Sequence, residues 1–400
     1  MIASATTILG VAKPEAAMAV PLGPTCPALY VLGVQGTGQS SPNADPTADT
    51  GVVGALVGQV INAVPNLVQR SYIGYDAGFG GAVPGGGAEP YARSVGEAAD
   101  LLRAAAAQIG SDCPATLLAA VGYSQGAQAV AEFAQDVGAG NGPVPADRIA
   151  GIALYSNPTR TAQSPVFPGR PGQSVPDPAP GTPGTAVSSV QIANPTADGA
   201  GLADEGATYG ALTGRVADIC VDGDLACSAP DRAALLRVGA EIAAQADLRD
   251  PLAALGSIQG LLSAALGNAW TTVVLDDFQI EADNADYLPH ASLAQRLIDA
   301  ADPRIPTPDP VDRDAAAARW NELISALGVN PLGVLPKLAG QLSAAWGQLL
   351  ADNADLVNPA VLLRFVDTVA RHNGYASTGQ ILTGTGWFIA LAHDLAGGRS

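Results

Sequence analysis

Apolar residues are arranged in two alternating patterns over the first 227 residues. Short apolar runs, which predict strands, lie at 28–34, 71–75, 115–121, 150–155 and 215–220. Stretches with apolar residues at i, i+3 and i+4, which predict helices, cover 51–64, 91–109 and 125–137. The run at 115–121 (ATLLAAV) is continuously apolar, as in a strand buried on both faces of a parallel sheet. The repeated order of strand and helix therefore predicts an α/β fold, a parallel sheet covered by helices on both faces.

The pattern changes after residue 227, where helical spacing dominates. Helices are predicted at 231–246, 252–266, 292–300, 315–327 and 335–350, and a terminal amphipathic helix at 386–396. A proline-rich break at 303–310 separates two of them, and the stretch at 164–184, rich in proline and glycine, predicts a surface loop.

Composition and charge exclude several classes of protein. A hydrophobic fraction of 48% with only 14% charged residues indicates a folded chain with a sizeable core. The net charge is 19 − 37 = −18, which repels phosphate backbones, so no nucleic-acid partner is expected. No uninterrupted apolar run reaches the roughly 18 residues of a membrane span, so no transmembrane segment is predicted. We expect a monomer.

The N-terminus and the cysteines bear on the compartment. Residues 1–22 have the apolar and small residues of a signal peptide but lack its basic start, so a loose N-terminal arm is the alternative. Four cysteines suggest disulfides in an exported chain, with buried free thiols as the alternative. A zinc site is disfavoured because no paired CxxC or nearby histidine accompanies them. We therefore expect a secreted or cell-envelope protein.

One motif carries a candidate nucleophile. Gly122-Tyr123-Ser124-Gln125-Gly126 fits G-x-S-x-G, which forms a tight turn from a strand to a helix and exposes the serine hydroxyl. The motif follows the apolar run at 115–121 and opens the predicted helix at 125–137, and the N-terminus of that helix favours developing negative charge. A coincidental turn in a glycine-rich chain is the alternative.

Around this motif the chain resembles the cutinase family of secreted α/β-hydrolase esterases. Four features carry the resemblance in order: Cys26 before the first strand, the Gly36-Thr37-Gly38 turn, Cys113-Pro114 leading into the strand and GYSQG, and an aspartate bracketed by Cys220 and Cys227. The resemblance implies a cutinase-like three-layer α/β-hydrolase core. It also implies Cys26–Cys113 and Cys220–Cys227 disulfides and an oxyanion-hole turn at Thr37.

The resemblance also points to an acid and a base. The family spacing favours Asp224 over Asp222 as the acid. His372 is followed three residues later by an aromatic residue and then by the last helix, as the family's histidine is. His290 also precedes a predicted helix and stays as the second candidate, whereas His393 lies within the terminal helix and is interpreted as structural.

Compact cutinases place the histidine soon after the second cysteine, whereas this chain interposes the helical block. We therefore expect a core made of residues 23–227 and 366–400, and a helical insertion at 228–365. The insertion is predicted to be either a lid or acyl-chain groove over the site, or a satellite domain that stabilises the fold.

The predicted function is a serine esterase that works through an acyl-enzyme. Ser124 attacks the carbonyl, His372 accepts its proton, Asp224 orients the imidazole, and the backbone N–H groups of Gln125 and Thr37 bind the oxyanion. No metal or organic cofactor is required. The substrate is expected to be lipid-like, as for a lipase, phospholipase, thioesterase or cutinase.

The sequence also allows two rival functions. Residues 33–40 (GVQGTGQS) nearly fit a phosphate-binding loop, but Gln39 replaces the lysine that would meet the phosphate charge. The second rival is a non-catalytic lipid-binding protein with a hydrolase fold, which the presence of Ser124 and Asp224 disfavours.

Overall fold

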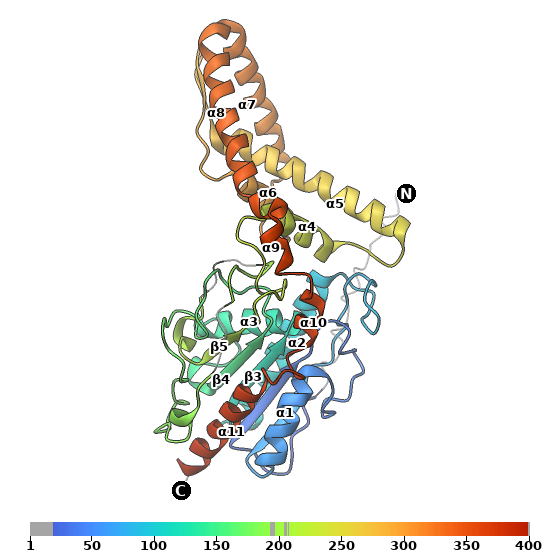
Figure 1. Cartoon of the computed structure of the whole chain (residues 1–400), viewed down its shortest axis with the longest axis vertical. Helices are drawn as coiled ribbons and strands as arrows, with labels where there is room; N and C mark the ends of the chain where they lie inside the picture. The colour runs from blue at the N-terminus through green and yellow to red at the C-terminus, as the bar shows by residue number, and fades with distance from the viewer. Residues whose placement is uncertain (1–18, 193–196, 204–205, 207, 399–400) are drawn as a thin grey trace, which may run out of the picture.

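The computed structural model describes residues 19–192, 197–203, 206 and 208–398. Residues 1–18 of the predicted signal segment or arm lie outside this described part. The core contains one five-stranded parallel sheet in the order β2-β1-β3-β4-β5 (Figure 1). The strands are β1 (Leu29–Val34), β2 (Val68–Tyr72), β3 (Leu117–Tyr123), β4 (Ile149–Tyr155) and β5 (Val216–Ile219).

Helices cover both faces of this sheet. Alternate residues of β1 point to opposite sides, because side chains of a strand alternate between faces. Tyr30 and Leu32 belong to the core under α2 (Tyr91–Asp112) and α3 (Gln125–Gly138). Leu29 and Val31 belong to the core under α1 (Gly51–Ala63) and α11 (Leu382–Gly397). The predicted three-layer α/β fold is confirmed.

One strand is displaced from its predicted place. The prediction at 71–75 falls three residues too late, because β2 spans Val68–Tyr72. This edge strand contains Gln69 and Arg70, which interrupt the apolar run, and Arg70 is held by the Asp49 carboxylate at 2.6 Å. An edge strand needs only partial burial, so it can contain polar residues. An apolar run therefore does not mark the start of β2.

The strand order creates a crevice at one edge of the sheet. The chain runs from β1 outward to β2 and then returns to β3 on the other side of β1. Segments that follow β1 and β3 therefore diverge at the carboxyl edge, which is where parallel α/β sheets bind ligands. Thr37 follows β1 and Ser124 follows β3, so both candidate site residues lie at this switch point.

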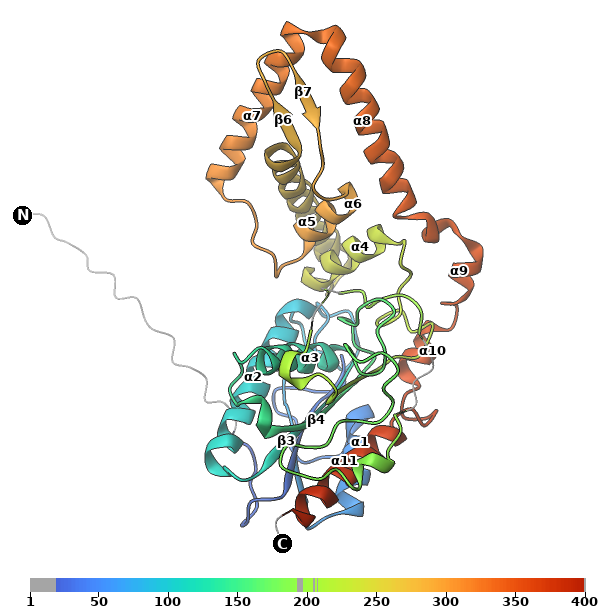
Figure 2. The same ribbon diagram turned by 90° about the vertical axis from the view of Figure 1, so that its left-hand side faces the viewer.

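The segment after β5 forms a helical extension that stands away from the core (Figures 1 and 2). It contains α4 (Ala234–Gln245), α5 (Pro251–Thr272), α6 (Leu293–Ala301), α7 (Pro310–Val329), α8 (Pro331–Ala351) and α9 (Pro359–Leu363). An unpredicted hairpin, β6 (Phe278–Ile280) and β7 (Ala285–Tyr287), follows α5. The chain then enters α10 (Thr368–Asn373) and α11.

Four helices of the extension begin at an aspartate or asparagine followed by proline. In each pair the acidic or amide side chain accepts a backbone N–H of the first turn; the N-caps are Asp250, Asp309, Asn330 and Asn358. The predicted starts at 315 and 335 are consequently too late, since α7 begins at 310 and α8 at 331.

The two ends of the extension are tied together. Asp355, which is largely buried, accepts hydrogen bonds from the backbone and the guanidinium of Arg232 at 3.1 and 2.8 Å. The backbone N–H of Ala234 donates to the Asp352 carbonyl at 3.2 Å. These contacts return the chain to the core beside the point where it left.

Two disulfides close loops of very different length. Cys26 pairs with Cys113 across 87 positions, and Cys220 pairs with Cys227 across 7. The first joins the entrances of β1 and β3, and the second closes the loop that follows β5.

We predict that the two bridges differ in their effect on stability. In the chain-entropy model, removing the long bridge (Cys26→Ser with Cys113→Ser) costs about 4.6 kcal/mol and removing the short one (Cys220→Ser with Cys227→Ser) about 2.5 kcal/mol, both upper figures. Urea unfolding of the two double variants measures this. A larger loss for the short bridge would contradict an entropic origin.

Candidate active site

Ser124 lies in a strained turn between β3 and α3. Its φ of 55° and ψ of −122° fall where non-glycine residues are rare. Both flanking glycines are required by close approach. A Cβ on Gly122 would lie 2.4 Å from the Gly126 carbonyl oxygen, and one on Gly126 would lie 2.2 Å from the Val34 carbonyl oxygen. The turn thus holds the serine between β1 and its own helix.

His372 meets Ser124 from a distant part of the chain. Its Nε2 is 2.9 Å from Ser124 Oγ, and its Nδ1 is 2.9 Å from Asp224 Oδ1. An ionised carboxylate only accepts, so the proton of the neutral imidazole belongs on Nδ1 and Nε2 is free to accept from the serine hydroxyl. The Tyr123 hydroxyl donates to the His372 carbonyl at 2.6 Å and holds the backbone of α10 over the turn.

Asp224 is buried within the loop closed by Cys220 and Cys227. Its Oδ1 also accepts the Ala226 N–H at 3.1 Å, and its Oδ2 accepts the Tyr375 hydroxyl at 2.9 Å. Burial, and next the Asp224 carboxylate, raise the pKa of Tyr375 well above its usual value, so this hydroxyl stays protonated and can donate. Both carboxylate oxygens are therefore satisfied without solvent.

Sequence reasoning missed two polar neighbours of the imidazole. In the sequence, Tyr375 is only the aromatic residue that helps to identify His372, and no role is predicted for its hydroxyl. Ser156 follows β4, has a φ of 55°, and places its Oγ 2.9 Å from His372 Nδ1. Both serines that contact His372 thus adopt positive φ at the carboxyl edge of the sheet. A lone serine after an apolar run carries no signal of this role.

Asp222, the competing acid, contacts other residues. Its carboxylate accepts Arg364 at 2.8 Å, and its carbonyl accepts Arg371 at 2.5 Å. The Thr368 hydroxyl accepts the N–H of Leu225 at 2.8 Å. These contacts dock the segment that carries His372 onto the disulfide-closed loop.

The other two histidines lie away from this cluster. His290 belongs to the helical extension, is 73% exposed, and has its Nδ1 3.5 Å from Asp277. His393 is exposed on α11.

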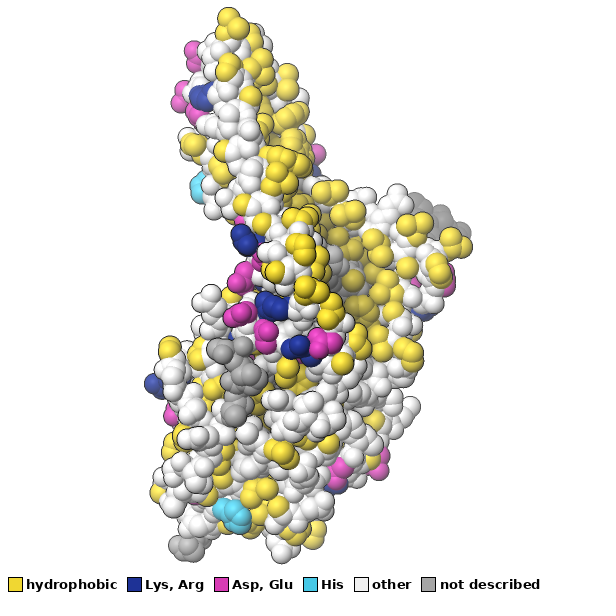
Figure 3. Space-filling model, viewed as in Figure 1, with side chains coloured by type: hydrophobic (Ala, Val, Ile, Leu, Met, Phe, Trp, Pro, Cys, Tyr) yellow, Lys and Arg dark blue, Asp and Glu magenta, His cyan; other side chains and the backbone are white. Residues whose placement is uncertain are grey.

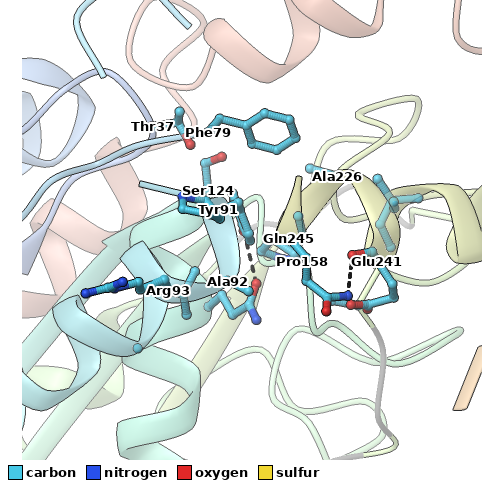
Figure 4. A pocket seen from close by; sticks show the side chains of 18 of the residues that line it. Thr37, Phe79, Tyr91, Ala92, Arg93, Ser124, Pro158, Ala226, Glu241 and Gln245 are labelled. Carbon is cyan, nitrogen blue, oxygen red and sulfur yellow. Dashed lines mark hydrogen bonds between the residues drawn. The ribbon is translucent and has the colours of Figure 1, made fainter. Parts of the chain in front are cut away.

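The turn after β1 approaches Ser124 from the other side. The Thr37 hydroxyl donates to the Gln125 side-chain oxygen at 3.3 Å, and the Gln125 amide donates to the Gly78 carbonyl at 2.9 Å. The buried Gln125 side chain therefore fixes the surrounding loops, and its backbone N–H opens α3. In Figure 4, Thr37 and Ser124 lie side by side at one end of the pocket.

A model of the cutinase family matches residues 25–235, more than half of the chain. The chain belongs to the cutinase family. The predicted resemblance and the α/β-hydrolase core are thereby confirmed, and the helical extension lies almost entirely beyond the matched segment.

This cutinase family member is similar to three proteins in sequence or in structure. A carboxylesterase Culp6 homolog of Corynebacterium glutamicum is 27% identical over 215 residues, 51% of this chain and 66% of the relative. The chain thus spans just under two thirds of that relative's length. The catalytic core domain of acetyl xylan esterase from Trichoderma reesei is 20% identical over 59% of this chain and 99% of that one, with a TM-score of 0.35. Lysin B from Mycobacteriophage D29 is 17% identical over 76% and 90%, with a TM-score of 0.33.

A cavity of about 870 Å³ adjoins Ser124 and His372. The core supplies one wall, including Phe79, Val83 and Leu202. The extension supplies the other; its lining residues are Ala240, Glu241, Ala244 and Gln245 of α4, with Pro303 and Arg304 after α6. The extension therefore shapes the pocket of this cutinase family member.

Two glutamates, Glu132 and Glu241, also line the cavity. Burial, and next the neighbouring Asp302 carboxylate, raise the pKa of Glu241 to about 8. Arg304 lies 3.3 Å from Glu241 but only 2.7 Å from Asp302, so its charge is shared. Burial also raises the pKa of Glu132, which faces the same region.

Within the ranges that the structure describes, no three His, Cys, Asp or Glu side chains are grouped so as to hold a metal ion.

We predict that Glu241 makes stability depend on pH. The folded protein keeps a proton that the unfolded chain loses above about pH 4.5, so stability falls between pH 4.5 and about 8 and levels off above. In the unaltered protein we expect the free energy of unfolding to be roughly 1–3 kcal/mol lower at pH 9 than at pH 5 because of this group. Glu241→Gln should remove this loss.

Urea unfolding at the two pH values measures this difference. Glu322→Gln, which removes an exposed carboxylate on α7, is the control. Equal pH dependence in both variants would show that Glu241 is not the group responsible.

Proposed function

We propose that this protein is a serine hydrolase of carboxylic esters that works through an acyl-enzyme. The observation that carries the proposal is the continuous chain of contacts from Ser124 Oγ through His372 to Asp224, at the switch point of the sheet, where Ser124 and His372 line a cavity. Membership of the cutinase family and the likeness to a carboxylesterase support the same chemistry.

In the proposed mechanism, Ser124 Oγ attacks the ester carbonyl while its proton passes to His372 Nε2. Asp224 stabilises the resulting imidazolium. The backbone N–H groups of Thr37 and Gln125 receive the oxyanion, the second of them at the N-terminus of α3. The imidazolium then protonates the leaving alcohol, and water, activated by the same histidine, hydrolyses the acyl-enzyme.

The substrate we propose is a lipid-like ester. Phe79, Val83, Leu202 and the alanines of α4 line the same cavity as Ser124, so an aliphatic acyl chain would lose its contact with water there. The extension serves in this proposal as a wall of the acyl-binding cavity.

We further propose that the protein acts outside the cytoplasm, secreted or in the cell envelope, as a monomer. Two disulfides are typical of proteins that fold in an oxidising compartment. One chain supplies the candidate nucleophile, base and acid, so the proposed chemistry requires no second copy.

Parallel alanine variants test the assignment. Ser124→Ala and His372→Ala should each lower kcat/KM on a short-chain p-nitrophenyl ester at least about 10³-fold, because both act in the same transition state. His290→Ala, on an exposed histidine outside the cavity, should change it by less than about twofold. Loss of activity only in His290→Ala would overturn the base assignment. Absence of turnover by the unaltered protein on every acyl chain length would favour the non-catalytic lipid-binding alternative.

Tyr375 is predicted to support the acid. Tyr375→Phe removes the hydrogen bond to Asp224 Oδ2 and leaves a buried carboxylate oxygen unsatisfied. We expect kcat to fall about tenfold with KM unchanged, which corresponds to the loss of one hydrogen bond to a charged group.

The matched control is Tyr72→Phe. Tyr72 lies on the edge strand β2, and its hydroxyl donates to the Asp49 carboxylate. Equal losses of activity in the two variants would mean that general destabilisation, and not positioning of the acid, accounts for the effect.

A further inference from the structure

The exposed apolar side chains of this protein are concentrated in one region. All the large apolar residues that are exposed in the described chain lie between Leu235 and Leu382, and none lies in the described part of 19–227. On α5 they follow one stripe at spacings of three and four, because residues so spaced share a helix face: Leu252, Leu255, Ile258, Leu262, Leu266 and Trp270.

A second stripe follows α8 and continues toward the site. On α8 it consists of Leu332, Leu335, Leu342, Trp346 and Leu350. Beyond α8 the exposed apolar residues are Val357, Leu362, Leu363, Val366 and Val369. Helix α10 carries both Val369, which is 70% exposed, and His372. In Figure 3 hydrophobic side chains gather over α8, its continuation and α5 as one area, which we call the apolar face.

The apolar face carries almost no charge. Helix α5 has no charged residue, and the one charged residue of α8, Lys337, is bound to Asp286 at 3.0 Å. Where the face reaches the core, Arg364 and Arg371 are each paired with an aspartate. The face therefore offers no cluster of free cations to anionic lipid, and the net charge of the chain is −18.

Helix α5 has the hydropathy of a membrane-spanning helix, but part of it packs against the rest of the extension. The 27-residue segment Pro251–Asp277 is long and apolar enough to span a membrane by length and composition, because it contains an 18-residue window with a mean hydropathy of 1.3, of which 17% is buried. The C-terminal part of the helix packs against the extension, with Ala265 and Ala269 buried. Trp270, at the end of the exposed stripe, is 49% exposed and also contacts Trp320, with ring centroids 4.8 Å apart. The C-terminal part of α5 is thus fixed to the extension, and the leucines of its stripe are exposed.

This arrangement places the apolar face close to the catalytic cavity. The connection between α4 and α5 contacts the cavity wall, since the N–H of Leu248 donates to the Gly80 carbonyl at 2.7 Å, next to Phe79. Helix α4 lines the cavity itself. A surface bound to the apolar face would therefore lie beside the cavity wall that the extension supplies.

We propose that the apolar face docks on an uncharged lipid surface and that α5 lies along this surface with Trp270 and Trp346 as anchors. The proposal rests on the proposed function, because it explains how an ester that is insoluble in water reaches Ser124. The absence of free charge selects a neutral or zwitterionic lipid. A second copy of the chain fits less well, because two molecules of charge −18 repel each other.

Vesicle flotation tests the proposal without requiring turnover. The full chain and its Ser124→Ala variant are mixed with phosphatidylcholine vesicles, and both should float, so that docking is measured separately from hydrolysis. Leu255→Asp and Leu342→Asp place a charge on each stripe and should each lower the bound fraction at least about tenfold. Neither variant should change kcat/KM on a soluble short-chain ester or the melting temperature, because both positions are exposed.

The controls separate the alternatives. His393→Asp adds an aspartate on α11, outside the apolar face, and should float like the unaltered protein. Binding that requires anionic phosphatidylglycerol, or that disappears at high salt, would overturn the proposal because it would be electrostatic. A dimer in light scattering that the two leucine variants dissociate, or no flotation at all, would also overturn it. If the unaltered protein hydrolyses the soluble ester, Ser124→Ala does not, and neither protein floats, the docking proposal is rejected and the proposed function stands.

Discussion

The candidate site depends on the docking of one returning segment onto one short loop. His372 reaches Ser124 only because the segment that carries it is held by Asp222 through two arginines and by the N–H of Leu225. The Cys220–Cys227 bridge keeps that loop in shape and presents Asp224 from within it. Without these contacts the imidazole would belong to a mobile connection far along the chain from the serine. The same loop therefore supplies the candidate acid and locates the candidate base.

This dependence explains how the core tolerates a long insertion between acid and base. The cost of closing a loop grows only slowly with its length, so a long excursion is acceptable when its ends are fixed together. The pairing of Arg232 with Asp355 fixes them at the base of the extension. The extension is consequently free to acquire its own roles. Helix α4 lines the cavity at one end, and the outward stripes of α5 and α8 occupy the other.

The sequence predicted the elements that strong apolar patterns specify, and it named in advance the residues that the structure brings together at Ser124. Local chemistry explains what it missed. Strand β2 is polar because it lies at an edge, and the starts of α7 and α8 follow from asparagine or aspartate before proline, a capping signal that apolar spacing does not contain. Ser156 contacts the imidazole only through the pairing of β4 beside β3, which is a long-range property of the sheet.

In the extension, the leucine stripes of α5 and α8 are exposed, although the apolar stripe of an amphipathic helix is usually its buried face. A stripe of leucines at helical spacing normally predicts the buried face, and on that assumption α5 and α8 would form the centre of a bundle. Here the buried residues of α5 are small or polar, such as Ala265 and Ala269, and those of α8 are Val334 and Leu338, whereas most leucines of both helices are exposed. Exposing so much aliphatic surface is unfavourable in water, at roughly 25 cal/mol per Å². Such a surface is reasonable where something apolar covers it, and its position beside the cavity that Ser124 lines is consistent with the lipid surface proposed above.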